Sequence, residues 1–460
     1  MSKLVQRAER RVSVTDHIVP TSEKILPGVT LCVCPTDKFK VGRFSLSLLL
    51  PLDDEATPVR TLLFSVLRRG NVTYPTLADI NRRLDELYAT PYHVSNTTRG
   101  AYQRIGFSAE LLGEDYLPDG TDLLGGLIDL MKDMLFYPLT EQDGLLRARY
   151  IEAEKKNTVD HIRSIRNHPS AYAMTRFYDV FYRNEVWGHL LTGDEAQLRA
   201  ITAEQLHEEW TNMLRHAPIR CFYVGDMPAC EVARRVRAML KYELDRIGRS
   251  FAPTATLALC PSRMISQDGS VTRVEEELQA GQSHLILGFR TDVTLASPDF
   301  YAMMLCHEIL GLSPVSRLFV HVREKHGLCY SCASEYHIDQ GDIVIRCGLS
   351  EDNRALAESA ILEQIRVMQA GEFTDAEWTA ARKSLMNSYR QVGDSTGAIA
   401  NFYDLRAILG VDQTVESCMA HFEAVTREQV ADVAKRIRLD VIYFGRGTGE
   451  FDGEDGEDDV

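Results

Sequence analysis

Features that would place this chain in a membrane, in a secretory pathway or on a nucleic acid are missing from its 460 residues. It has no run of about 18 apolar residues, the length that a membrane-spanning helix needs. The N-terminal stretch M-S-K-L-V-Q-R-A-E-R-R has no apolar core after its charges, so it is not a signal peptide. A basic stripe with interleaved aromatic residues is also missing, which argues against nucleic-acid binding. We therefore expect a cytoplasmic protein.

Sequence motifs for metal sites and common catalytic sites are equally scarce. The ten cysteines are expected to be reduced thiols in the cytoplasm. Their close pairs are Cys32-x-Cys34 and Cys329-x-x-Cys332, and neither has a second pair at zinc-site spacing, so we predict no cysteine metal site. H-E-x-x-H is absent, and no G-x-S-x-G or glycine-rich phosphate loop is found at an expected strand–helix junction.

What is present is an ordinary globular composition, 45% hydrophobic and 25% charged. The net charge is −15, and seven of these negative charges lie in the glycine-rich stretch 450–459, which leaves −8 for the rest. We interpret residues 447–460 as an acidic, disordered tail. The length suggests two to four domains.

An internal repeat organises the rest of the chain. Strand-like, helical and Thr-capped segments recur in the same order, at an offset that drifts from 241 to 220 residues. Thr140, Thr202, Thr374 and Thr426 are predicted helix caps in this pattern. We predict a tandem duplication of one α+β lobe, each lobe a largely antiparallel sheet with helices packed on one face. The predicted boundaries are a first lobe at 1–248, a linker at 249–270 and a second lobe at 271–446.

The most informative stretch is Gly311–Cys332, which reads G-L-S-P-V-S-R-L-F-V-H-V-R-E-K-H-G-L-C-Y-S-C. Pro314 suits the first turn of a helix, and Gly327 suits its left-handed stop. From Leu328 the period changes to two, which predicts a strand. An arginine near a helix end and a half-buried strand tyrosine would be the structural interpretation of Arg323 and Tyr330.

This stretch resembles a signature in the C-terminal half of the insulinase/pitrilysin-type zinc peptidases, the inverzincins. In that family the arginine and tyrosine of R-E-K-x-G-L-x-Y contact substrate, and here they are Arg323 and Tyr330. The family's first repeat carries H-x-x-E-H, two zinc ligands and a general base. In this chain the corresponding helix, 58–70, has Thr61, Phe64 and Ser65 at those positions. The region 152–161 that should supply the third ligand retains acids and a histidine, but the equivalent residue cannot be identified.

The resemblance therefore implies a chain without its own zinc. It is closest to bacterial two-subunit peptidases, and the segment R-R-L-D-E-L-Y (residues 82–88) is similar to their metal-less member. The leading hypothesis is a non-catalytic, substrate-binding subunit of a heterodimeric zinc metallopeptidase that processes peptides, with zinc in the partner subunit. The alternative is a purely structural assembly protein with a degenerate peptidase fold. A self-sufficient hydrolase with other ligands is the least favoured option.

Overall fold

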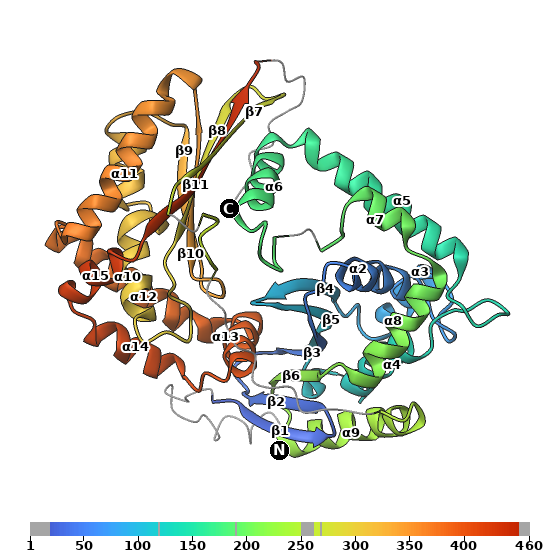
Figure 1. The fold of residues 1–460 in the computed structure, drawn as a ribbon. Coiled ribbons are helices and arrows are strands. Elements are labelled where there is room, and N and C mark those ends of the chain that lie inside the picture. Colours follow the sequence, from blue (N-terminus) through green and yellow to red (C-terminus); the bar gives the residue numbers. More distant parts are fainter. Residues whose placement is uncertain (1–18, 118–119, 189–190, 250–261, 267–268, 450–460) are drawn as a thin grey trace.

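The computed structural model describes residues 19–117, 120–188, 191–249, 262–266 and 269–449. Two sheets, each with its own set of helices, form two lobes (Figure 1). Most of the predicted linker and residues 450–460 of the predicted tail lie outside the described residues. The predicted lobe boundaries therefore remain predictions.

The first sheet has six strands in the order β1-β2-β6-β3-β5-β4. All neighbours are antiparallel except β2 and β6, which are parallel. Its strands are β1 (Thr21–Leu26), β2 (Val29–Pro35), β3 (Val41–Pro51), β4 (Tyr92–Arg99), β5 (Tyr102–Leu112) and β6 (Ile219–Gly225).

Among the described residues, the second sheet repeats this plan with no equivalent of β1. Its order is β7-β11-β8-β10-β9, and again one pair, β7 and β11, is parallel. Each strand takes the place of its counterpart in the first sheet, which confirms two tandem α+β lobes with mostly antiparallel sheets. The strands are β7 (Thr272–Leu278), β8 (Ser283–Arg290), β9 (Ser331–His337), β10 (Asp342–Leu349) and β11 (Arg438–Gly447).

Helices line one face of each sheet and bury two large apolar cores. None of the helices in the described ranges has the length and apolarity to cross a membrane. The first half contains α2 (Ala56–Leu67), α3 (Leu77–Glu86), α4 (Leu123–Phe136), α5 (Ala148–Ser164), α6 (Pro169–Phe181), α7 (Glu195–Ala200), α8 (Ala203–His216), α9 (Ala229–Arg246) and the 3-10 turns η1 (Glu114–Tyr116) and η2 (Ile165–Asn167). The second half contains α10 (Phe300–His307), η3 (Glu308–Leu312), η4 (Leu318–Glu324), η5 (Glu351–Asn353), α11 (Arg354–Ala370), α12 (Asp375–Gln391), η6 (Val392–Asp394), α13 (Thr396–Leu409), α14 (Val415–Ala424) and α15 (Arg427–Ala434).

The two halves also exchange one helix each. Helix α6 belongs to the first half in sequence but packs on β8 and β11 of the second sheet. Helix α13 of the second half packs in the same way on β3 and β6 of the first sheet (Figure 1). Alternate residues of a strand point to opposite faces, so each sheet has a second face that its own helices do not cover. Helix α6 or α13 from the other half covers that face. This exchange joins the lobes.

Buried charges fix both exchanged helices. Asp404 of α13 pairs with Arg104 and Arg220 of the first sheet at 3.1 Å each. At the other junction, the fully buried guanidinium of Arg290 lies 3.6 Å from the Phe181 ring centroid and donates to the Phe181 carbonyl. These contacts hold the C-terminal end of α6 against β8.

The Arg290 site contains two buried carboxylates. Arg290 Nε donates to Asp440 at 2.8 Å, and its Nη1 lies 3.8 Å from Asp342. His337 Nδ1 is 2.7 Å from Asp342. Burial lowers the pKa of His337, but the hydrogen bonds that its ring donates to the Asp342 and Glu335 carboxylates outweigh burial and raise the pKa to about 10. Two cations therefore balance the two carboxylates at neutral pH.

We expect Arg290→Met to lower the free energy of unfolding by about 3–5 kcal/mol, because two buried carboxylates then keep His337 as their one cationic neighbour at this site. Urea denaturation measures this change. The matched control is Arg273→Met, which removes an exposed pair with Glu358 and should cost at most about 1 kcal/mol. Equal losses in the two variants would contradict the role assigned to Arg290.

Candidate functional site

The three residues aligned with H-x-x-E-H by the sequence analysis, Thr61, Phe64 and Ser65, lie on α2 and take part in packing and hydrogen bonds. Thr61 Oγ1 accepts hydrogen bonds from Asn96 Nδ2 at 2.8 Å and Gln103 Nε2 at 3.2 Å. The Thr61 hydroxyl is also 2.7 Å from the Leu191 carbonyl oxygen, its acceptor. These hydrogen bonds connect α2 to β4 and β5. All of these partners of the Thr61 hydroxyl are neutral groups.

The other two positions offer no metal ligand either. Phe64 is 2% exposed and packs against Phe107 with ring centroids 5.6 Å apart. Ser65 Oγ donates to the Thr61 carbonyl at 3.2 Å. A phenyl ring now occupies the place of the general base, and α2 cannot activate a water.

Helix α5 carries the region that should hold the third ligand. Of its acids, Glu154 is buried, 3% exposed, and pairs with Arg69 from the end of α2. Glu152 is exposed and lies 3.3 Å from Lys155. The structure thus places Glu154 toward α2, but as the counter-ion of an arginine. A single carboxylate that already has a cationic partner does not hold a zinc ion.

The signature stretch forms a π-helix, η4, in place of the predicted α-helix from Pro314. Pro314 and its neighbours form a turn, and η4 begins at Leu318. The Lys325 N–H donates to the Val320 carbonyl at 2.9 Å, the five-residue spacing of a π-helix. Gly327 has φ of 59°, which confirms the predicted left-handed stop. The strand starts at Ser331, later than predicted, so Tyr330 precedes it.

Arg323 and Tyr330 lie on the two sides of this glycine stop and are both exposed. The Arg323 side chain is 42% exposed and has Glu324 at 3.9 Å and the Phe319 ring at 4.8 Å. Tyr330 is 68% exposed, and its hydroxyl makes no hydrogen bond to any residue that the structure describes. The backbone of Tyr330 is fixed, because its N–H donates to the Gly348 carbonyl at 2.8 Å. The structural interpretation of a half-buried tyrosine therefore does not describe Tyr330.

A buried arginine that the sequence analysis did not single out positions η4. Arg317 Nε donates to Gln364 of α11 at 3.1 Å, and Nη1 pairs with Glu377 of α12 at 2.7 Å. Glu377 also closes the capping box of α12 with Thr374. Leu318 and Val322 are fully buried beneath the same helix. These contacts hold the backbone of η4 and leave Arg323 on its outer side.

Three cysteines come together beside Tyr330. Cys329 and Cys332 meet Cys347 of β10, and their sulfur atoms all lie within 4.8 Å of one another. The sequence analysis considered Cys329 and Cys332 as an isolated pair. Cys347 was missed because it is the cross-strand neighbour of Cys332 in the β9–β10 hairpin and is distant from it along the chain. A prediction of the hairpin register would have paired the two cysteines.

Known proteins with the same sequence pattern and fold support the resemblance. Residues 200–385 match the family described as "Peptidase M16 inactive domain". The "Probable inactive metalloprotease YmfF" of Bacillus subtilis is 28% identical over 92% of this chain and 96% of its own length. The "Uncharacterized zinc protease YmxG" of the same organism is 20% identical over 67% of this chain and 72% of its own length. A conserved protein from Enterococcus faecalis has the same fold, with a TM-score of 0.84 and 25% identity over 94% of this chain and 99% of that chain.

These similarities confirm the resemblance to the insulinase/pitrilysin-type peptidases and their inactive members. Residues 200–385 start at the end of α7, contain α8, β6 and α9 of the first half, and extend into α12 of the second half, so they include the signature stretch. A metalloprotease-like chain without catalytic function agrees with Thr61, Phe64 and Ser65 in the ligand positions.

We expect Thr61→Val to lower the free energy of unfolding by about 1–3 kcal/mol, because the amides of the buried Gln103 and the partly buried Asn96 lose their common acceptor. Urea denaturation followed by circular dichroism measures the change. The control is Thr379→Val on α12, where the exposed hydroxyl bonds only to the carbonyl of Asp375. That variant should stay within about 0.5 kcal/mol of the original chain. If Thr61→Val is as mild as the control, the former ligand position is not part of the packing of α2.

Proposed function

We propose that this relative of the M16 peptidases is the non-catalytic, substrate-binding subunit of a heterodimeric zinc metallopeptidase that processes peptides. Its partner would be a homologous subunit with an intact H-x-x-E-H motif and the catalytic zinc. The observation that carries the proposal is the contrast between the two repeats. Helix α2 of the first repeat has none of the residues of H-x-x-E-H, whereas the second repeat has the signature with Arg323 and Tyr330 exposed.

Arg323 suits contact with the peptide backbone or a carboxylate. A guanidinium presents several donors in a fixed plane and is charged at any physiological pH. In the structure its charged neighbour Glu324 is 3.9 Å away and 59% exposed, so this pair is weak and can be replaced by substrate. The stacking on Phe319 limits the directions in which the side chain can extend.

Tyr330 suits a transition-state contact. Its hydroxyl is exposed, and the hydrogen bond to Gly348 fixes its backbone, so the base of the side chain is in place before substrate arrives. A preorganised donor to a developing oxyanion is worth about 100- to 1,000-fold in rate. The partner's zinc would polarise the carbonyl and activate the attacking water. A chain kept only for assembly has no need of the intact R-E-K-H-G-L-C-Y signature that holds Arg323 and Tyr330.

The relatives in Bacillus subtilis also support a division of labour. One organism has both a protein named a probable inactive metalloprotease and a protein named a zinc protease that resemble this chain. We infer that this chain corresponds to the first kind and that its partner corresponds to the second. A cytoplasmic location of the complex remains a prediction.

We expect the isolated chain to cleave no peptide and to form a stable heterodimer with a zinc-bearing relative from the same organism. The physical reason is that two such chains would enclose the substrate between them, and a stable interface of this kind buries at least about 1,200 Å². Co-expression and gel filtration measure the association, with each chain alone as control. Separate elution of the two chains at micromolar concentration would remove the main support for the heterodimer.

We expect Tyr330→Phe to reduce the kcat of the heterodimer by about 100- to 1,000-fold with little change in KM, because only a transition-state donor is removed. The matched control is Tyr242→Phe on α9, since Tyr242 has the same exposed fraction of 68%. Arg323→Ala should act mainly on KM, and its control is Arg366→Ala on α11, where the side chain is 65% exposed. Both variants should assemble normally. Unchanged turnover in both would leave the structural assembly role as the better explanation.

A further inference from the structure

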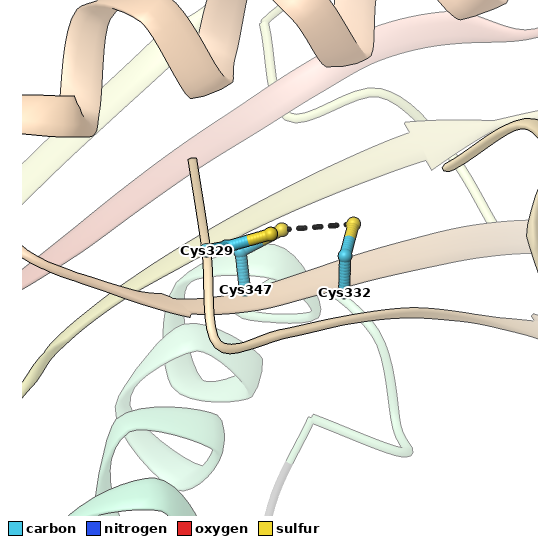
Figure 2. A group of neighbouring side chains, drawn as sticks. All are labelled: Cys329, Cys332 and Cys347. Atoms are coloured by element: carbon cyan, nitrogen blue, oxygen red, sulfur yellow. Dashed lines mark hydrogen bonds between the residues drawn. The ribbon is translucent and has the colours of Figure 1, made fainter. Parts of the chain in front are cut away.

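Three thiols from the β9–β10 hairpin and the segment before it gather at one point (Figure 2). Cys332 of β9 and Cys347 of β10 are direct cross-strand partners, with their sulfur atoms 3.1 Å apart. Cys329 joins them from the segment between η4 and β9. Within the described ranges, no other set of three histidine, cysteine or acidic side chains brings its ligand atoms this close together.

The sulfur positions are close to those of a metal–thiolate centre. A tetrahedral zinc with Zn–S bonds of about 2.3 Å separates its sulfur ligands by about 3.8 Å. Here the sulfur atoms of Cys332 and Cys347 are 3.1 Å apart and all three sulfur atoms lie within 4.8 Å of one another, so shifts of roughly 1 Å would suffice. Cys329 can make such a shift most easily, because it lies outside both strands and is only half-buried.

The electrostatics of this cluster differ from those of the other buried thiols. Burial raises the pKa of Cys306 to about 12, as expected for an inert core cysteine. The pKa of Cys329 is instead lowered, because the neighbouring thiols of Cys332 and Cys347 favour its thiolate more than burial opposes it, and Arg323 adds a favourable charge.

We propose that Cys329, Cys332 and Cys347 form a three-thiolate binding site for a thiophilic divalent cation of the zinc class. Thiolate sulfur is a soft ligand that selects such ions over magnesium or calcium. Binding releases the protons of the thiols to solvent, and the three thiolates with one divalent cation carry a single negative charge. Arg323, whose charge already acts on Cys329, offsets that charge. The fourth coordination position is left for water or an external ligand.

This site is separate from the lost zinc position on α2 and does not depend on the proposed peptidase role. It lies in the second lobe, on the hairpin that follows η4, whereas Thr61, Phe64 and Ser65 lie in the first. The isolated full-length chain is sufficient to test it, so the outcome says nothing for or against a heterodimer.

The test is titration of the reduced full-length chain with Cd²⁺ under anaerobic conditions, after removal of the reductant. We expect one Cd²⁺ per chain, a near-ultraviolet thiolate-to-metal charge-transfer band and a higher melting temperature. Loss of a residue that only supports a metal ligand costs roughly 10- to 100-fold in affinity. Cys329→Ser and Cys347→Ser each remove a ligand itself, so each should weaken Cd²⁺ binding by more than that. Cys329→Ser is the safer variant for folding, because Cys329 is half-buried and outside the strands.

The matched control is Cys230→Ser on α9, which removes an exposed thiol far from the hairpin in sequence and should leave the band and the stoichiometry unchanged. The site would be disproved if the fully reduced chain gave no charge-transfer band. It would also be disproved if folded Cys329→Ser bound Cd²⁺ with the affinity and the band of the original chain.

Discussion

The buried guanidinium of Arg290 is the contact on which the arrangement of the two lobes depends. It joins three elements that are distant in sequence: the end of α6, strand β8 and the carboxylate of Asp440 at the start of β11. A buried charge of this kind is tolerated only where its partners are in place, so it selects one position for α6. Asp404 does the same for α13 at the opposite junction, with two arginines around one carboxylate. The two junctions are thus similar in position and reversed in charge.

The packing of the first repeat does not depend on the residues of an H-x-x-E-H motif. The core beneath α2 takes Phe64 as an ordinary apolar residue, and the Thr61 hydroxyl has neutral hydrogen-bonding partners in Thr57, Asn96, Gln103 and Leu191. The second repeat is constrained differently. Arg317 fixes η4 from beneath through Gln364 and Glu377, so the residues on its outer side are positioned without contributing to the core.

Much of the fold was predictable because it follows from local patterns. Thr202, Thr374 and Thr426 cap their helices as predicted, each with a complete capping box. Thr140 does not: it pairs with Leu146 in an isolated bridge, and α5 begins only at Ala148. The helix exchange was not predictable, since the apolar face of α6 or α13 fits either sheet by period alone. The same holds for Cys347, whose neighbours are set by strand register, and for the exposure of Tyr330, which depends on where β9 begins.

The exchanged helix α13 also has a consequence for synthesis of the chain on the ribosome. The first sheet is complete in sequence once β6 ends at Gly225, but the helix that covers its second face ends at Leu409. Until then, Cys34, Leu49 and Phe222 on that face have no permanent cover, although all three are buried in the finished protein. An uncovered apolar sheet face is prone to association with other chains. The nascent first lobe therefore has a prolonged need for chaperone protection, which ends only when most of the second lobe has emerged.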